Sequence, residues 1–217
     1  MVINKIPRLR VFGWSTLAAL LSLSAFSQNA GAVLITAGQS FPTTGTGTFS
    51  GTKIYDVTTP FVSSTGSFTG SLEAQVYSEA SGSLDFVYQF LNNANSLDPI
   101  LTFSASDFKG FTTNADDFLV VPTDVQPQTV SRTPATGPDA GGVILFDFGG
   151  GVAAGSLSDL LIIQTNATQV EPGNVSIQDG GQAVVATLAP AVPEPATFGM
   201  LTLAISGLFV RRNRSRR

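Results

Sequence analysis

The segment SLDFVYQF, residues 83–90, alternates large apolar side chains with polar or smaller ones. In an extended chain, one face would carry Leu84, Phe86, Tyr88 and Phe90. The opposite face would carry Asp85, Val87 and Gln89. Because successive side chains of a strand point to opposite faces, this period of two predicts a half-buried β-strand. The segment therefore indicates a sheet protein with one face against a core.

Similar short segments recur on both sides of this strand. Clusters of Gly, Pro, Asn and Asp separate them, for example at 92–95, 136–139 and 179–181. The stretch 123–142 is expected to be the longest strand-poor connection, either a surface loop or a split between two sheets. Eight or nine short strands predict a mainly β fold, an antiparallel β-sandwich or jelly roll, over residues 33–188. The other predicted strands are 33–37, 53–57, 68–77, 100–104, 118–121, 143–148, 160–165 and 183–188.

The body of the chain is acidic, whereas its two ends are basic. Charged residues make up only 12% of the chain, well below the usual share of about 25%. Residues 33–190 hold 14 Asp and Glu against three basic residues, a net charge of −11, and the other eight basic residues lie outside this range. Since an acidic surface repels phosphate backbones, we expect no binding of nucleic acid.

The sequence contains neither cysteine nor histidine. It therefore lacks disulfides, thiolate nucleophiles, the commonest general base and the commonest zinc ligand. Without histidine, and with only two lysines in the body, a serine nucleophile has no base of the usual kind. We therefore expect a body that is not an enzyme and needs no cofactor.

The tightest acidic group consists of Asp107, Asp116 and Asp117, with Asp98 and Asp124 nearby in the sequence. Paired carboxylates could act as acid and base in glycoside hydrolysis, or they could bind calcium. However, neighbouring strand residues point to opposite faces, the spacing D-x-D-x-D-G does not occur, and Asp is frequent in turns. Solvated loop carboxylates are the leading prediction, and a hydrolase and a calcium site are the alternatives.

Residues 1–32 have the three regions of a secretory signal peptide. Three basic residues among the first ten precede an uncharged, mostly apolar stretch, 11–26, which is followed by small residues. Ala30 and Ala32 supply the A-x-A cleavage pattern, which predicts cleavage after Ala32, with Ala30 or Ser27 as alternatives. A retained membrane helix is the competing interpretation.

Residues 189–217 contain the triplet Pro193-Glu194-Pro195, an apolar run at 196–210 and a basic tail at 211–217. A helix over this run would reach about 22 Å into a hydrocarbon core about 30 Å thick, which makes a short membrane span. The two prolines favour an extended triplet outside the membrane. Five arginines would hold the tail on the cytoplasmic side: Arg211, Arg212, Arg214, Arg216 and Arg217.

The order of signal peptide, Pro-Glu-Pro triplet, short apolar span and Arg-rich tail resembles the PEP-CTERM sorting signal of exported bacterial proteins. The resemblance implies recognition by an exosortase, a membrane-embedded cysteine protease and transpeptidase-like enzyme that processes its substrates near the triplet. It implies that Pro193, Glu194 and Pro195 are recognised, that 196–210 enters the membrane, and that 211–217 is the cytoplasmic stop. Three body segments also resemble a recurring small protein type with this signal: GSLDFVYQFLNNANS, ASDFKGFTTNADDF and LLIIQTNATQVEPGNVSIQDGG.

These observations give one main hypothesis and two alternatives. The main hypothesis is an exported, non-enzymatic protein of the cell surface or extracellular matrix, delivered by the export machinery and an exosortase. Its C-terminal segment would lie transiently in the inner membrane, and its body would contact exopolysaccharide. The first alternative is a secreted carbohydrate-binding module, which would need exposed aromatic side chains. The second is a hydrolase that uses Asp107, Asp116 and Asp117.

Overall fold

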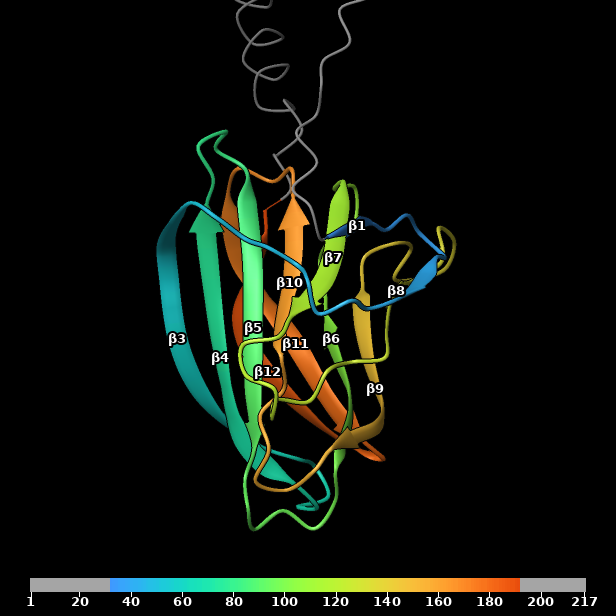
Figure 1. The fold of residues 1–217 in the computed structure, drawn as a ribbon. Coiled ribbons are helices and arrows are strands. Elements are labelled where there is room, and N and C mark those ends of the chain that lie inside the picture. Colours follow the sequence, from blue (N-terminus) through green and yellow to red (C-terminus); the bar gives the residue numbers. More distant parts are fainter. Residues whose placement is uncertain (1–31, 192–217) are drawn as a thin grey trace, which may run out of the picture.

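The computed structural model describes residues 32–191, which form twelve β-strands in two six-stranded antiparallel sheets (Figure 1). These residues contain no α-helix. The described residues therefore include no helix that is long and apolar enough to cross a membrane. The predicted signal-peptide helix and C-terminal membrane segment lie outside the described residues. The prediction of a mainly β fold with antiparallel sheets is confirmed.

The first sheet has the strand order β1-β7-β10-β5-β4-β3. The alternating residues 84–90 lie in β5, which pairs with β4 on one side and β10 on the other. Its central position agrees with its run of aromatic residues, which suit a pleated, buried surface. The strands are β1 (Val33–Leu34), β7 (Thr113–Phe118), β10 (Leu160–Thr165), β5 (Leu84–Asn92), β4 (Thr69–Ser78) and β3 (Thr52–Val62).

The second sheet lies behind the first in Figure 1 and has the order β12-β11-β6-β9-β8-β2. The edge strands β3 and β12 approach each other, since Ser64 N, in the turn after β3, donates to Gln182 O at 2.8 Å. The two sheets are thus tied along one side. The strands are β12 (Gly181–Pro190), β11 (Val170–Asp179), β6 (Ile100–Ala105), β9 (Ile144–Val152), β8 (Thr129–Arg132) and β2 (Ser40–Pro42).

A cluster of aromatic rings joins the two sheets. Phe103 of β6 contacts Tyr88 and Phe90 of β5, with ring centroids 5.1 and 6.2 Å apart. It also contacts Phe146 of β9 at 6.3 Å, within the second sheet. All four side chains are buried. Each such side chain stabilises the fold by about 1.5–3 kcal/mol relative to an exposed position, so the sheets share one core.

The outer face of β5 is covered, which the sequence did not predict. The alternation places Phe86 and Tyr88 in the core as expected, but Asp85 and Val87 on the other face are only 2% and 0% exposed. The connection between β2 and β3 crosses this face (Figure 1). We call its residues 43–51 the strap. The prediction of a half-buried strand is therefore wrong for the middle of β5, which is buried on both faces.

Three further strand predictions need correction. The predicted strand 118–121 is wrong, because β7 ends at Phe118 and residues 119–121 leave the sheet with exposed side chains. The region 123–142 contains β8 and leads from the first sheet to the second. The strands β2, β8 and β11 were missed, and of β7 only Phe118 was predicted. β11 contains Pro172, which pairs with β12 but lies before Val175, where the pairing of β11 with β6 begins. The missing N–H of the proline therefore removes no hydrogen bond to β6.

The described chain enters and leaves the sheets at the same end. Near its beginning, Ile35 N donates to Thr113 O at 2.9 Å, and Thr113 pairs with Thr165 at the end of β10. Near its end, Ala191 N donates to Gln169 O at 2.9 Å, in the connection that follows β10. The segments before residue 32 and after residue 191 therefore attach to one end of the body (Figure 1).

Candidate functional site

The three aspartates of the predicted acidic group do not come together. Asp116 and Asp117 lie on β7 and are 1% and 0% exposed, so the prediction of solvated loop carboxylates is wrong for both. Asp107 follows β6 of the second sheet, is exposed, and has a φ of 73°. Ser106 Oγ donates to its carboxylate at 2.8 Å. Among residues 32–191, no hydrogen bond or ion pair joins Asp107 to either of the other two.

The two aspartates of β7 hold the beginning of the strap. Thr44 binds the Asp116 carboxylate twice, through its amide N at 2.9 Å and its hydroxyl at 2.5 Å. Gly45 N donates to Asp117 Oδ1 at 2.8 Å, and Gly47 N donates to the main-chain oxygen of Asp117 at the same distance. Bonds from N–H donors to a carboxylate are stronger than neutral ones. These aspartates therefore fix the strap against the end of β7 that lies beyond its pairing with β1.

A second buried carboxyl lies next to Asp117. Asp159, which immediately precedes β10, is 0% exposed. Burial raises the pKa of Asp159, and the adjacent carboxyl of Asp117 raises it further. Burial also raises the pKa of Asp117. The two carboxyls hydrogen-bond to each other, but neither oxygen of Asp159, nor Oδ2 of Asp117, receives a hydrogen bond from any other donor in the described part of the chain. We call Asp117 and Asp159 the carboxyl pair.

A separate acidic contact lies under the far end of the strap. Asp85 of β5 lies beside Glu79, whose Oε1 accepts from Ser50 Oγ at 2.7 Å. The pKa of Asp85 is raised to about 7, first by burial and then by its hydrogen bond with the Glu79 carboxyl, while a backbone hydrogen bond from Ser50 acts in the opposite direction. Two carboxyl groups can share a hydrogen bond only when one of them is protonated. This contact is therefore sensitive to pH.

Replacing Asp85 with asparagine is expected to reduce the pH dependence of stability. The folded carboxyl keeps its proton up to about pH 7, whereas the ordinary value is 3.8, so the folded state binds more protons between these values. The unfolding free energy must then fall as pH rises through that window. Between about pH 5 and about pH 8 we expect a loss of about 1–3 kcal/mol in the original protein that Asp85→Asn does not show.

The measurement is urea unfolding of the full chain at both pH values, with EDTA present. Asparagine keeps the shape of the side chain, can accept from the Ser50 amide and can donate to Glu79. The exposed Asp139, substituted in Asp139→Asn, serves as the control and should keep the original pH dependence. Equal pH dependence in Asp85→Asn and the original protein would disprove the role of this carboxyl.

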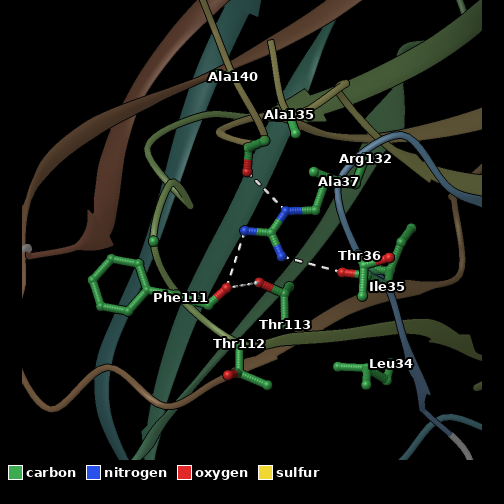
Figure 2. A pocket seen from close by; sticks show the side chains of 12 residues that line it. Leu34, Ile35, Thr36, Ala37, Phe111, Thr112, Thr113, Arg132, Ala135 and Ala140 are labelled. Atoms are coloured by element: carbon green, nitrogen blue, oxygen red, sulfur yellow. Dashed lines mark hydrogen bonds between the residues drawn. The ribbon is translucent and has the colours of Figure 1, made fainter.

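A buried arginine forms the wall of a hollow of about 440 Å³ at the end of the body where the chain enters (Figure 2). Arg132 Nε donates to Gly141 O at 2.7 Å, and its terminal nitrogens donate to Ile35 O, Phe108 O and Phe111 O at 2.7–3.1 Å. Burial lowers the pKa of the guanidinium. Its partners are all main-chain carbonyls, so Arg132 ties together the loops that surround the hollow.

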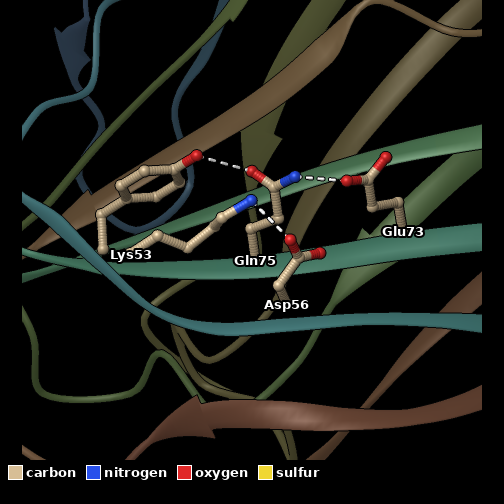
Figure 3. Close-up of polar contacts among 5 residues, drawn as sticks. Lys53, Asp56, Glu73 and Gln75 are labelled. Carbon is tan, nitrogen blue, oxygen red and sulfur yellow. Dashed lines mark hydrogen bonds and ion pairs between the residues drawn. The ribbon is translucent and has the colours of Figure 1, made fainter.

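A row of polar side chains covers the outer face of the first sheet along β3 and β4 (Figure 3). Tyr77 Oη donates to Gln75 Oε1 at 2.8 Å, and Gln75 Nε2 donates in turn to Glu73. Lys53 pairs with Asp56 of the same strand; this is the ion pair that the described residues contain. Exposed contacts of this kind add little to stability, so the row makes a solvated polar surface.

Sequence reasoning missed Asp85, Asp159 and Arg132, the buried polar residues that organise the loops. No motif marks them. A weak signal was present for Asp85, because an acidic residue in the middle of an apolar aromatic strand needs a partner once it is buried. For Asp159 and Arg132 the partners are main-chain groups or residues distant in the sequence, which spacing does not reveal.

The predicted sorting and cleavage residues fall outside the described residues, except for Ala32, which directly precedes β1. The structure therefore does not place Ala30, the triplet Pro193, Glu194 and Pro195, or the five arginines of the tail. The predicted processing roles of these residues stay predictions. The structure shows that β12 ends at Pro190, three residues before the Pro193-Glu194-Pro195 triplet.

Residues 191–217 match the family model described as the PEP-CTERM protein-sorting motif. Comparison with curated proteins and with solved structures found no significant match. The matched range contains the triplet, the apolar run and the basic tail, which confirms the resemblance drawn from the sequence. The motif implies export and a location in the cell envelope or outside the cell. The chain thus carries a C-terminal PEP-CTERM sorting motif behind a body of antiparallel sheets, consistent with an exosortase substrate.

Proposed function

We propose that this chain is an exported, non-enzymatic protein of the cell surface or extracellular matrix, with a β-sandwich body delivered through an exosortase. The observation that carries the proposal is the match of residues 191–217 to the PEP-CTERM sorting motif. Exopolysaccharide is the proposed partner of the body, whose low-charge acidic surface would make structural contacts with the matrix.

The geometry of the body supports delivery from a membrane-bound intermediate. Both the beginning and the end of the described chain lie at one end of the sheets, and the motif follows β12 without an intervening domain. A C-terminal segment in the membrane would then tether the body at one end only. The opposite end, which carries the turn between β11 and β12, would point away from the membrane and toward the matrix.

A structural role is also supported by what the acidic residues of β7 do. Both carboxylate oxygens of Asp116 accept hydrogen bonds from the strap, one from the main chain and one from the side chain of Thr44. A hydrolase of the kind considered from the sequence needs two carboxylates facing one substrate, and Asp107 shares no contact with Asp116 or Asp117 among the described residues. We therefore favour the non-enzymatic proposal over the hydrolase.

The carbohydrate-binding alternative receives no specific support. Sugar binding by stacking needs exposed aromatic rings on one face or in a cleft. Of the aromatic side chains in residues 32–191, Phe118 alone is exposed, at 39%. Its exposed neighbours Leu119, Val120 and Val121 are aliphatic. They form an apolar patch rather than an aromatic strip.

Mass spectrometry of the protein recovered from its native host tests the proposal. We expect the mature chain to begin at Val33, because Ala30 and Ala32 supply the cleavage pattern, and to end near Pro193-Glu194-Pro195. We expect to recover this form from the cell surface or the medium. A chain that keeps Met1 and is found only inside the cell would contradict the proposal.

A further inference from the structure

The carboxyl pair has more acceptor atoms than the protein supplies with donors. Asp117 Oδ1 accepts from Gly45 N at 2.8 Å and from Gln126 Nε2 at 3.4 Å. The other three carboxylate oxygens, Asp117 Oδ2 and both oxygens of Asp159, are buried and receive no hydrogen bond from any group of residues 32–191 outside the pair. A buried polar group without a partner costs about 1–3 kcal/mol, and a charged one costs more. A ligand that binds these three adjacent atoms would remove this cost.

No basic side chain of the described residues can be that partner. Lys53 is paired with Asp56 on β3, and Arg132 is bonded to main-chain carbonyls at the end where the chain enters. The third, Lys109, lies beside Gly142 in the same region as Arg132. Asp124 adds a further negative charge near Asp159. The site is therefore electronegative and lacks a cation of its own.

A proton alone does not satisfy the pair. One shared proton would bridge one oxygen of Asp117 and one of Asp159, which leaves the second oxygen of Asp159 without a partner. A metal ion, in contrast, can bind all three oxygens at once, since carboxylates bind hard cations through one or both oxygens. The number of unpartnered atoms thus favours a metal ion over a proton.

We propose that Asp117 and Asp159 form a binding site for one divalent cation of the calcium class. The ligands from the pair are Asp117 Oδ2 and both oxygens of Asp159. Residues 32–191 contain no group of three or more acidic side chains that could hold a metal ion, so amide or main-chain oxygens and water must complete the shell, as calcium permits. Gln126 is exposed and contacts Asp117, which places the pair beside the surface and gives a cation access.

Calcium is favoured over magnesium at this position. Calcium accepts six to eight oxygens in irregular arrangements, whereas magnesium demands near-octahedral geometry and keeps most of its water. Binding through both oxygens of the Asp159 carboxylate, as proposed, suits calcium, which takes carboxylates through one or both oxygens. The expected affinity is that of extracellular calcium modules, a Kd of about 10⁻⁴–10⁻³ M. The site is independent of the sorting route.

The proposal is tested by calorimetric titration of the full chain in detergent, after EDTA has removed bound metals. The probes are calcium chloride and magnesium chloride. We expect one calcium ion to bind per chain, weaker binding of magnesium, and a rise in Tm of about 3 °C or more at about 10 mM calcium. Absence of both binding heat and a Tm shift with calcium would overturn the proposal.

Asp159→Asn is the decisive variant, because it removes one carboxylate of the pair while the asparagine amide can still donate a hydrogen bond to Asp117. We expect its calcium affinity to fall by about tenfold or more, with the Tm shift lost. Asp107→Asn is the matched control: this exposed aspartate has a positive φ that asparagine also adopts, and it should bind calcium as the original protein does. Equal binding by Asp159→Asn and the original protein would place calcium elsewhere and overturn the assignment.

Discussion

Replacing Phe103 with alanine is expected to destabilise the body by about 3–5 kcal/mol, the largest effect of any single substitution considered for this protein. Phe103 is fully buried, and its ring contacts Tyr88 and Phe90 of the first sheet and Phe146 of the second. Truncation would remove the ring that joins the two sheets and leave a cavity in a core that cannot collapse freely.

The loss is measured by urea or thermal unfolding, and it corresponds to a fall in Tm of about 10 °C for a body of this size. Should Phe103→Ala not fold, Phe103→Leu should still show a smaller loss. The matched control is Phe118→Ala, which truncates an aromatic ring that is 39% exposed and should change stability by less than about 1 kcal/mol. Similar losses for Phe103→Ala and Phe118→Ala would contradict the shared core.

The sequence predicts the sheet core well because its signal is local. The alternation in β5 places Phe86, Tyr88 and Phe90 in the core, and β10 occupies the predicted residues 160–165. Both strands are central and lined by β-branched or aromatic residues, for which period and propensity agree. The mainly β fold and its antiparallel sheets could therefore be predicted without a structure.

The outer face of the first sheet could not be predicted, because its cover comes from elsewhere in the chain. From the sequence, Asp85 is a solvent-facing residue of a half-buried strand and Asp116 a solvated loop residue, yet the strap covers both. Its own sequence is rich in Gly, Ser and Thr and carries no periodic signal. Its path depends on hydrogen bonds to residues far along the chain, such as that from Gln164 Nε2 to Thr48 O at 2.8 Å.

The carboxyl pair was missed for a related reason. Asp117 and Asp159 are 42 positions apart in the sequence, and only the pairing of β7 with β10 brings them together. The sequence did single out Asp116 and Asp117, but with Asp107, which the structure separates from them. Proximity in sequence misleads in an antiparallel sheet, where the neighbours of a residue lie on other strands.

Replacing Pro193, Glu194 and Pro195 together with alanines is expected to abolish sorting while leaving the body folded. The prolines favour an extended chain outside the membrane, which a protease can bind. Alanine is the strongest helix former, so the substituted triplet would lose this preference for an extended chain. We expect the variant to stay uncleaved in the membrane fraction, at the level seen in a host that lacks the exosortase.

The matched control is the double substitution Pro138→Ala with Asp139→Ala, which removes a proline and an acidic residue from the exposed loop between β8 and β9. The backbone oxygen of Asp139 that accepts from Thr133 and Gly142 is kept in this variant. It should be processed like the original protein. Retention of the control as well would indicate a defect in folding or export rather than in sorting.

Sorting of this chain through its PEP-CTERM motif is tested most directly by an immunoblot for the body in fractionated cells of the native host. We expect the original protein and the loop control to appear in a shortened form at the surface or in the medium. We expect the triple-alanine variant to remain full length at its C-terminus in the membrane. Identical size and location for the triple-alanine variant and the original protein would contradict sorting through the motif.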